Sequence, residues 1–205
     1  KSDADKIHST LEKIDQNAFE LAVDTILHAK HIYIIGIRSC APLASFMAFY
    51  FTLMFPNVHL IQTSSSSEIF EQMVRIGKED VIIGISFPRY SMRTLKAMEF
   101  ANNRSAKVIT LTDIVHSPMN LYSSCNLIAD SDMASIVDSL VAPLSVINAL
   151  IVALCMKKQN EVAKTLEMLE DIWDEYQVYE NDEINYIDDS IKMRYGKVGD
   201  AELYE

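Results

Sequence analysis

Side chains that bind anions follow the first of several short apolar runs in this 205-residue chain. In GIRSC (36–40), Gly36 permits a tight turn, Arg38 provides a cation, and Ser39 provides a hydroxyl at the start of a helical stretch. A guanidinium and the free N–H groups of a helix N-terminus both attract anions. This segment therefore indicates an anion site, with a simple helix cap at Ser39 as the alternative.

More side chains of this kind lie in SFPRYSMRT (86–94), where Pro88 stops any earlier helix and Ser91 can cap the next one. The other donors in this segment are Ser86, Arg89, Arg93 and Thr94. A charge-assisted hydrogen bond contributes about 1.5–3 kcal/mol, whereas a helix dipole contributes about 0.3–1 kcal/mol. The arginines therefore favour a phosphate here, although Arg93 lies one turn into the helix and we expect it to face solvent.

Four consecutive serines lie between these two segments, in TSSSSE (63–68). Such a run would be costly in a core, but it fits a polar cradle at the start of a helix. Ser65 and Glu68 also have the spacing of a capping box, and this interpretation does not exclude the cradle.

Five apolar runs must position these segments: HIYIIG (31–36), NVHLIQ (57–62), DVIIGIS (80–86), KVITLT (107–112) and CNLIAD (125–130). Their Val and Ile content and continuous apolarity are typical of strands buried on both faces. Helical stretches at about 38–55, 67–77 and 91–103, and a short helix within 113–124, separate them. This alternation predicts an α/β fold with a five-stranded parallel sheet.

Further helices flank the predicted sheet. Residues 3–29 have the spacing of one or two amphipathic helices, and residues 136–177 form a long helical region. The apolar runs at 41–55 and 140–156 are shorter than the roughly 20 residues that span a bilayer. We expect them to be buried by the core or by a partner chain.

Ligands of an open parallel sheet bind beyond the carboxyl ends of the strands, at the switch point between the first and third strands. Ser39 follows the first of these strands, and the 86–94 loop follows the third. We therefore predict that Ser39, Ser86, Arg89 and Ser91 converge on one anionic site.

The order GIRSC, TSSSSE, SFPRYSMRT and TLTDIVHSP resembles the SIS (sugar isomerase) domain of RpiR/MurR-type transcriptional regulators, over about residues 5–160. In that family a G-x-G-x-S-like loop and an S-x-S-G-x-T-like loop grasp the phosphate of a sugar phosphate. Ser39 and Ser86 match the serines of these loops. Arg38 stands where the family has a glycine, and PRYS replaces the S-G step, as in a subset of such regulators.

The resemblance implies a three-layer αβα sandwich with flavodoxin-like strand order. It implies three regions: N-terminal helices (1–30) leading from a helix-turn-helix domain absent here, a SIS domain (31–177) and an acidic C-terminal tail (178–205). It also implies a homodimer or tetramer that senses a phosphorylated sugar or amino sugar and contacts DNA only through the absent domain. The ligand-binding residues that we expect are Arg38, Ser39, Ser86, Arg89, Ser91 and Thr94.

The alternative function is an aldose–ketose isomerase, which needs a base to move a proton between adjacent carbons. Glu68, after the second strand, and His116, after the fourth, are the candidates, and no motif fixes either one. We expect no catalysis, no cofactor and no metal. A purely structural dimerisation module is a third interpretation, and the clustered serines and arginines argue against it.

Charge and cysteine content set further limits. The net charge of −11 comes mainly from residues 161–205, with 14 acids and 4 bases, whereas residues 1–160 carry 15 acids and 14 bases. This balance offers no basic face for nucleic acid. Cys40, Cys125 and Cys155 include no CxxC pair and predict neither a disulfide framework nor a zinc cluster. We expect a cytoplasmic protein without a membrane span.

Overall fold

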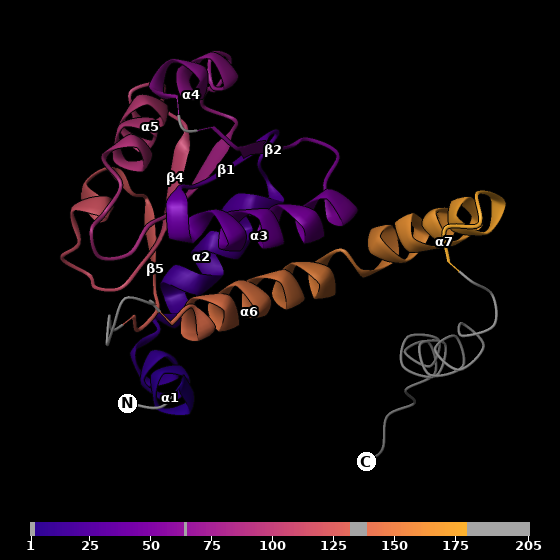
Figure 1. Cartoon of the computed structure of the whole chain (residues 1–205), viewed down its shortest axis with the longest axis horizontal. Helices are drawn as coiled ribbons and strands as arrows, with labels where there is room; N and C mark the ends of the chain where they lie inside the picture. Colours follow the sequence, from indigo (N-terminus) through magenta and orange to yellow (C-terminus); the bar gives the residue numbers. More distant parts are fainter. Residues whose placement is uncertain (1–2, 64, 132–138, 180–205) are drawn as a thin grey trace. The chain divides into compact units, whose positions relative to one another are not determined.

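The computed structural model describes residues 3–63, 65–131 and 139–179, and the chain divides into two compact units, residues 1–162 and 163–205. The first unit contains a five-stranded parallel sheet with the order β2-β1-β3-β4-β5 (Figure 1). The flavodoxin-like order is confirmed, and each strand lies within one of the five apolar runs. The strands are β1 (Ile32–Gly36), β2 (Val58–Ile61), β3 (Val81–Ile85), β4 (Lys107–Thr112) and β5 (Cys125–Ile128).

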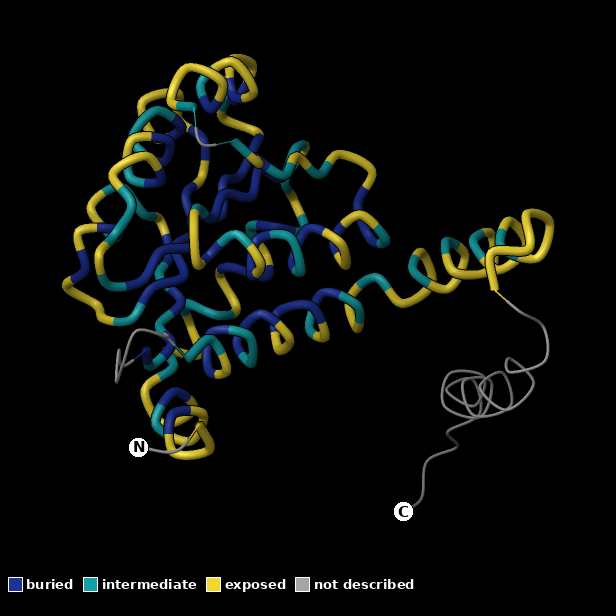
Figure 2. Tube along the Cα trace, in the orientation of Figure 1, coloured by how far each residue is buried: buried dark blue, intermediate teal, exposed yellow. Residues whose placement is uncertain are grey.

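Helices cover both faces of the sheet, which confirms the three-layer sandwich (Figures 1 and 2). Successive side chains of a strand point to opposite faces, so Ile34 and Ile35 of β1 enter two separate apolar clusters. Every residue of β1 and β3 is buried, as expected for strands covered on both sides. On one face lie α2 (Gln16–Leu27), α3 (Ala41–Met54) and α6 (Val141–Lys157), and on the other α4 (Ser66–Gln72), α5 (Met92–Asn102) and the 3-10 helix η2 (Pro118–Tyr122).

The expected N-terminal helices are present as α1 (Asp3–Lys13) and α2, but α1 buries a different side than its apolar spacing predicts. Lys6 and Thr10 are its buried residues, whereas Leu11 is 71% exposed. The backbone N–H of Asp130 donates to Thr10 Oγ1 at 2.9 Å, and Lys13 forms an ion pair with Asp130 at 3.6 Å. Polar contacts therefore contribute to the docking of α1, and of its apolar stripe Leu11 stays exposed whereas Ile14 packs against the core.

The long helical region consists of two helices, α6 and α7 (Gln159–Glu175). Lys158 separates them with φ −113° and ψ 25°, which lies outside the helical range. Residues 136–138 and the acidic tail from residue 180 onward lie outside the described residues. Helix α4 ends at Gln72, earlier than predicted, and Gly77 follows in a turn held by the Asp80 carboxylate, which accepts from its N–H at 2.8 Å.

No single helix in the described part of the chain is long and apolar enough to cross a membrane. Helices α6 and α7 together, as a broken pair, pass the same test by length and composition alone.

Candidate functional site

The carboxyl ends of β1 and β3 lie side by side, because the two strands pair in parallel with Gly36 opposite Ile85. The segment after β1 folds back at once as the 3-10 helix η1 (Arg38–Cys40). A Cβ at residue 36 would lie 2.6 Å from the carbonyl oxygen of Cys40. Glycine is therefore required by this close approach, and the approach presents Arg38 at the edge of the sheet.

An open cleft of about 460 Å³ lies at the carboxyl ends of β1 and β2. Arg38 and Arg93 are the charged residues among the described residues that line it, so the cleft attracts anions. Arg93 is exposed, as expected, and it also faces this cleft. The full lining is Gly36, Ile37, Arg38, Ala41, Leu60, Ile61, Gln62, Thr63 and Arg93.

Two of the predicted ligand residues have strained backbones. Arg38 has φ 60° and Arg89 has φ 62°, in the left-handed region that a residue with a Cβ rarely adopts. Arg89 follows Pro88, and proline followed by a positive φ is the arrangement of a type II turn. Residues held in such conformations cluster at ligand sites. Arg38 also occupies the position where the family pattern has a glycine, the residue that adopts this conformation most easily.

Ser86 and Ser91 are brought together within the loop after β3. Ser86 is buried, and its Oγ accepts a hydrogen bond from the Ser91 backbone N–H at 3.0 Å. Ser91 caps α5 as predicted, since its Oγ accepts from the Thr94 backbone N–H at 3.3 Å. The two serines thus fix the loop that carries Arg89.

Tyr90 ties this loop to the one after β4. Its hydroxyl donates to the Asp113 carboxylate at 2.8 Å, and Thr112 donates to the same oxygen at 3.2 Å. Burial and the hydrogen bond to Asp113 raise the pKa of Tyr90 above its usual value. Tyr90 therefore remains a neutral donor at physiological pH and restrains the loop.

The side chains of Thr94 and Ser39 have opposite environments. Thr94 lies in the first turn of α5 and is fully buried, and its Oγ1 lacks a hydrogen-bond partner. Ser39 is exposed within η1, and Cys40 rather than Ser39 holds the cap position of α3. The simple capping role for Ser39 is therefore wrong. Of the six predicted ligand residues only Arg38 lines the cleft, and the roles of the other five stay predictions.

The segment after β2 differs from the capping box. Ser65 occupies the cap position of α4, but its hydroxyl bonds to the Ser67 hydroxyl at 2.9 Å and makes no capping bond to a backbone N–H of the helix. The Glu68 carboxylate instead accepts from the Thr63 hydroxyl, whose oxygen accepts from the Ser65 backbone N–H at 3.0 Å. Thr63 lines the cleft, and the exposed Glu68 contacts Thr63 through this hydrogen bond. Neither Glu68 nor His116, the two candidate catalytic residues, is among the described residues of the lining.

The cysteines are packing residues, as the sequence indicates. Cys40 and Cys125 are buried in the apolar cluster that includes α3 and α6. Burial raises the pKa of the Cys125 thiol to about 11 and also raises the pKa of Cys155, so both thiols stay neutral and unreactive. Within the described residues, no group of three metal-ligating side chains occurs.

The sequence indicates a polar cradle that begins at Thr63, but the predicted ligand residues include neither Thr63 nor Gln62, which both line the cleft. These residues follow β2, the edge strand, whereas the prediction placed the site between the loops of β1 and β3. A direct signal was present, because polar residues at the end of an apolar strand lie on the ligand-binding edge of a parallel sheet.

Residues 25–153 match the SIS domain family. Over 167 residues, the chain is 25% identical to an uncharacterised HTH-type transcriptional regulator of Caldanaerobacter subterraneus, covering 78% of this chain and 58% of that protein. The chain therefore spans less than two thirds of the length of this curated relative.

The fold also resembles solved structures. The sugar isomerase domain of an RpiR transcription factor from Sphaerobacter thermophilus aligns with a TM-score of 0.78 and 22% identity, covering 82% of this chain and 94% of that one. The Vibrio vulnificus NanR protein complexed with ManNAc-6P aligns with a TM-score of 0.73 and 19% identity, covering 83% and 66%. Proteins described as putative sugar-phosphate isomerases share the fold as well. At these identities the likeness concerns the fold alone.

Proposed function

This chain belongs to the SIS domain family, and from that membership we propose that it binds a phosphorylated sugar or amino sugar as an effector and does not convert it. In the longer protein, this binding would modulate DNA binding by a helix-turn-helix domain that precedes the SIS domain. Such a sensor would act in the cytoplasm, where it meets both the metabolite and DNA.

The observation that carries this proposal is the cleft with two arginines at the carboxyl edge of the sheet. Arg38 and Arg93 come from different elements, and the described lining holds no acid to neutralise them. Two guanidinium groups can hold a phosphate through several charge-assisted hydrogen bonds, each contributing about 1.5–3 kcal/mol. The volume of about 460 Å³ lies in the range of small-molecule sites.

Backbone strain at Arg38 supports a ligand in this cleft, and a buried polar atom at Thr94, next to Arg93 in α5, supports a ligand near the start of that helix. A positive φ costs an arginine about 1–2 kcal/mol, and such strain persists where a site depends on the side chain. The unpaired Thr94 hydroxyl carries a comparable cost, about 1–3 kcal/mol, for a buried polar group without a partner. A ligand oxygen that accepts from Thr94 after a small movement of the loop would remove this cost.

The absence of turnover in the proposal rests on the environment of Glu68. A general base must lie within hydrogen-bond reach of the proton that it removes. Glu68 is engaged by the Thr63 hydroxyl and lies outside the described lining of the cleft. The relatives described as transcriptional regulators support a sensor, and the isomerases of the same fold provide the alternative.

A thermal-shift screen of sugar phosphates, each paired with its unphosphorylated sugar, tests the proposal. Ligand at 100 times its dissociation constant stabilises the fold by about 2.7 kcal/mol, which corresponds to several degrees in Tm for a chain of this size. We expect stabilisation by a phosphorylated sugar and none by its unphosphorylated partner. Equal stabilisation by both sugars, or by none of the phosphates, would contradict the proposal.

Incubation of each stabilising sugar phosphate with the protein, followed by NMR of the sugar carbons, tests the absence of turnover. We expect the sugar to remain unchanged. Interconversion of aldose and ketose that disappears in Glu68→Gln would establish the isomerase alternative.

We also propose that the domain is a homodimer or a larger oligomer, because α3 and α6 leave large apolar side chains exposed. Phe49 of α3 is 62% exposed, and Val152 and Met156 of α6 are 56% and 75% exposed. Sedimentation of Phe49→Glu should show a shift toward monomer. The control Val74→Glu, at a position 63% exposed after α4, should sediment as the wild type does. A monomeric wild type at micromolar concentration would contradict this proposal.

A further inference from the structure

Two histidines meet at the amino ends of β1 and β2, at the opposite end of these strands from the cleft. His31 directly precedes β1, and His59 is the second residue of β2. A hydrogen bond of 3.2 Å joins His31 Nδ1 and His59 Nε2, with the donor set by the tautomers, and the two ring centroids are 5.3 Å apart. His59 is exposed and His31 is partly exposed. Both rings are therefore accessible to solvent.

The register of the sheet places the two rings on one face. His59 pairs directly with Tyr33 across β1 and β2, and His31 lies two residues before Tyr33 on the same side. The Tyr33 and His59 rings stack with centroids 4.8 Å apart, which restrains the His59 imidazole. Strand β2 is an edge strand, and within the described residues no further strand pairs with it.

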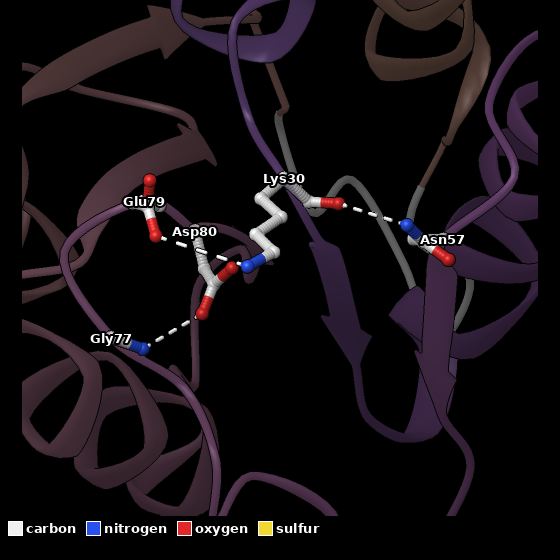
Figure 3. A network of polar contacts seen from close by, with 5 residues as sticks. All are labelled: Lys30, Asn57, Gly77, Glu79 and Asp80. Atoms are coloured by element: carbon white, nitrogen blue, oxygen red, sulfur yellow. Dashed lines mark hydrogen bonds and ion pairs between the residues drawn. The ribbon is translucent and has the colours of Figure 1, made fainter.

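Polar contacts fix the segments next to both histidines, and Figure 3 shows two of them, the ion pair between Lys30 and Glu79 at 3.9 Å and the hydrogen bond between Asn57 and Lys30. The Lys30 N–H donates to the Glu79 carbonyl at 2.8 Å, and the Asn57 side-chain amide donates to the Lys30 carbonyl at 3.3 Å. The Ile32 N–H donates to the Asn57 carbonyl at 2.9 Å. Lys30 and Asn57 stand one and two residues before His31 and His59, so this network holds the pair in position.

We propose that His31 and His59 form a two-nitrogen site for a divalent transition-metal ion of the class of Zn²⁺, Ni²⁺ and Cu²⁺, with water in the remaining positions. A metal–nitrogen bond is about 2.0–2.1 Å long. Two nitrogens bound to one metal therefore lie about 2.9–3.4 Å apart when the nitrogen–metal–nitrogen angle is between about 90°, as in square-planar geometry, and about 109°, as in tetrahedral geometry. The observed 3.2 Å lies within that range. Imidazole nitrogen is a preferred ligand of these three ions.

The protonation state of His59 and the nearby charge also favour a bound metal ion. Burial, and then the charge of His31, lower the pKa of His59, so its imidazole is more often neutral at pH 7, the form that a metal needs. The carboxylate of Asp80 acts on His59 in the opposite sense and adds the negative charge that favours a cation. Asp80 itself accepts from the Gly77 N–H at 2.8 Å (Figure 3), so it is engaged in its own turn.

Calorimetric titration of the untagged protein with ZnCl₂ tests the site. We expect one saturable ion per chain. Loss of a residue that only supports a metal ligand weakens metal affinity about tenfold or more. Loss of one of the two ligands themselves should therefore weaken Zn²⁺ affinity at least about tenfold. His31→Gln and His59→Gln should each show this loss, whereas the control His8→Gln, on exposed α1, should bind as the wild type does. Unchanged affinity in either site variant, or an equal loss in the control, would overturn the proposal.

A second measurement needs no variant. The electron paramagnetic resonance spectrum of Cu²⁺ added at one equivalent reports the number of bound nitrogens, and we expect two imidazoles at pH 7.5. This signal should weaken as the solution is made more acidic, because a protonated imidazole cannot bind the ion. A spectrum with one nitrogen, or with none, would show that the histidines do not act as a pair.

Discussion

The strained Arg38 backbone leads to a prediction in which fold stability and ligand affinity change in opposite directions. Arg38 has φ 60°, a conformation that costs a residue with a Cβ about 1–2 kcal/mol. Arg38→Gly removes this cost, but the glycine gives the unfolded chain more entropy, which costs about 0.5–1 kcal/mol. At the middle of these two ranges the folded domain should gain about 0.75 kcal/mol overall, or about 1.5–3 °C in Tm.

The same substitution removes a cation from the cleft. If the guanidinium makes one charge-assisted hydrogen bond to the phosphate, its loss costs about 1.5–3 kcal/mol. This free energy corresponds to an increase in Kd of about 10- to 150-fold. Unfolding by urea and calorimetric titration with the effector measure the two effects on one protein sample.

Arg38→Ala serves as the matched control. Alanine removes the guanidinium and keeps the Cβ, so this variant should lose affinity to the same extent without the gain in stability. Unchanged affinity in both variants would refute the role of Arg38 in the site. A Tm for Arg38→Gly at or below that of Arg38→Ala would refute the argument from strain.

Three further predictions concern other parts of the structure. Arg89→Ala should weaken effector binding by about 1.5–3 kcal/mol in calorimetry and leave the circular dichroism spectrum unchanged. Unaltered affinity would show that Arg89 does not contact the ligand and that the 86–94 loop only forms a turn. Gly36→Ala should lower the Tm, because its Cβ would lie 2.6 Å from the Cys40 carbonyl oxygen; an unchanged Tm would contradict that contact. Because burial raises the pKa of Cys125 to about 11, only the unfolded thiol ionises just above pH 9, so stability falls as the pH rises from 9 toward 11. The fall should be about 1.4 kcal/mol per pH unit relative to Cys125→Ala in urea unfolding, and equal slopes for the two proteins would contradict it.

The strands of this domain could be predicted because their apolarity is continuous. Strand Val81–Ile85 is buried on both faces, so its residues are continuously apolar and do not alternate between apolar and polar as in a surface strand. Glycine and polar residues flank it. The neighbouring positions of the loops after β1 and β3 followed from the strand order. The cap at Ser91 followed from residue type alone.

Other features depended on tertiary contacts that the sequence does not display. Lys6 and Thr10 of α1 are buried because Thr10 meets the backbone of Asp130, 120 positions away in sequence. The Glu68 carboxylate bonds to Thr63 rather than to the cap of its own helix. Arg38 stands where the family pattern has a glycine, the residue that adopts a positive φ most easily. The replacement by arginine does not by itself show that this backbone angle is kept.

Mapping of the effector site by NMR tests the central claim most directly. Backbone amide shifts of the labelled domain would be followed during titration with a stabilising sugar phosphate and, separately, with its unphosphorylated sugar. We expect the phosphorylated ligand to shift mainly the amides of residues 36–41, 62–63 and 86–94. Shifts confined to other parts of the described chain, such as the amino ends of the strands, would contradict it.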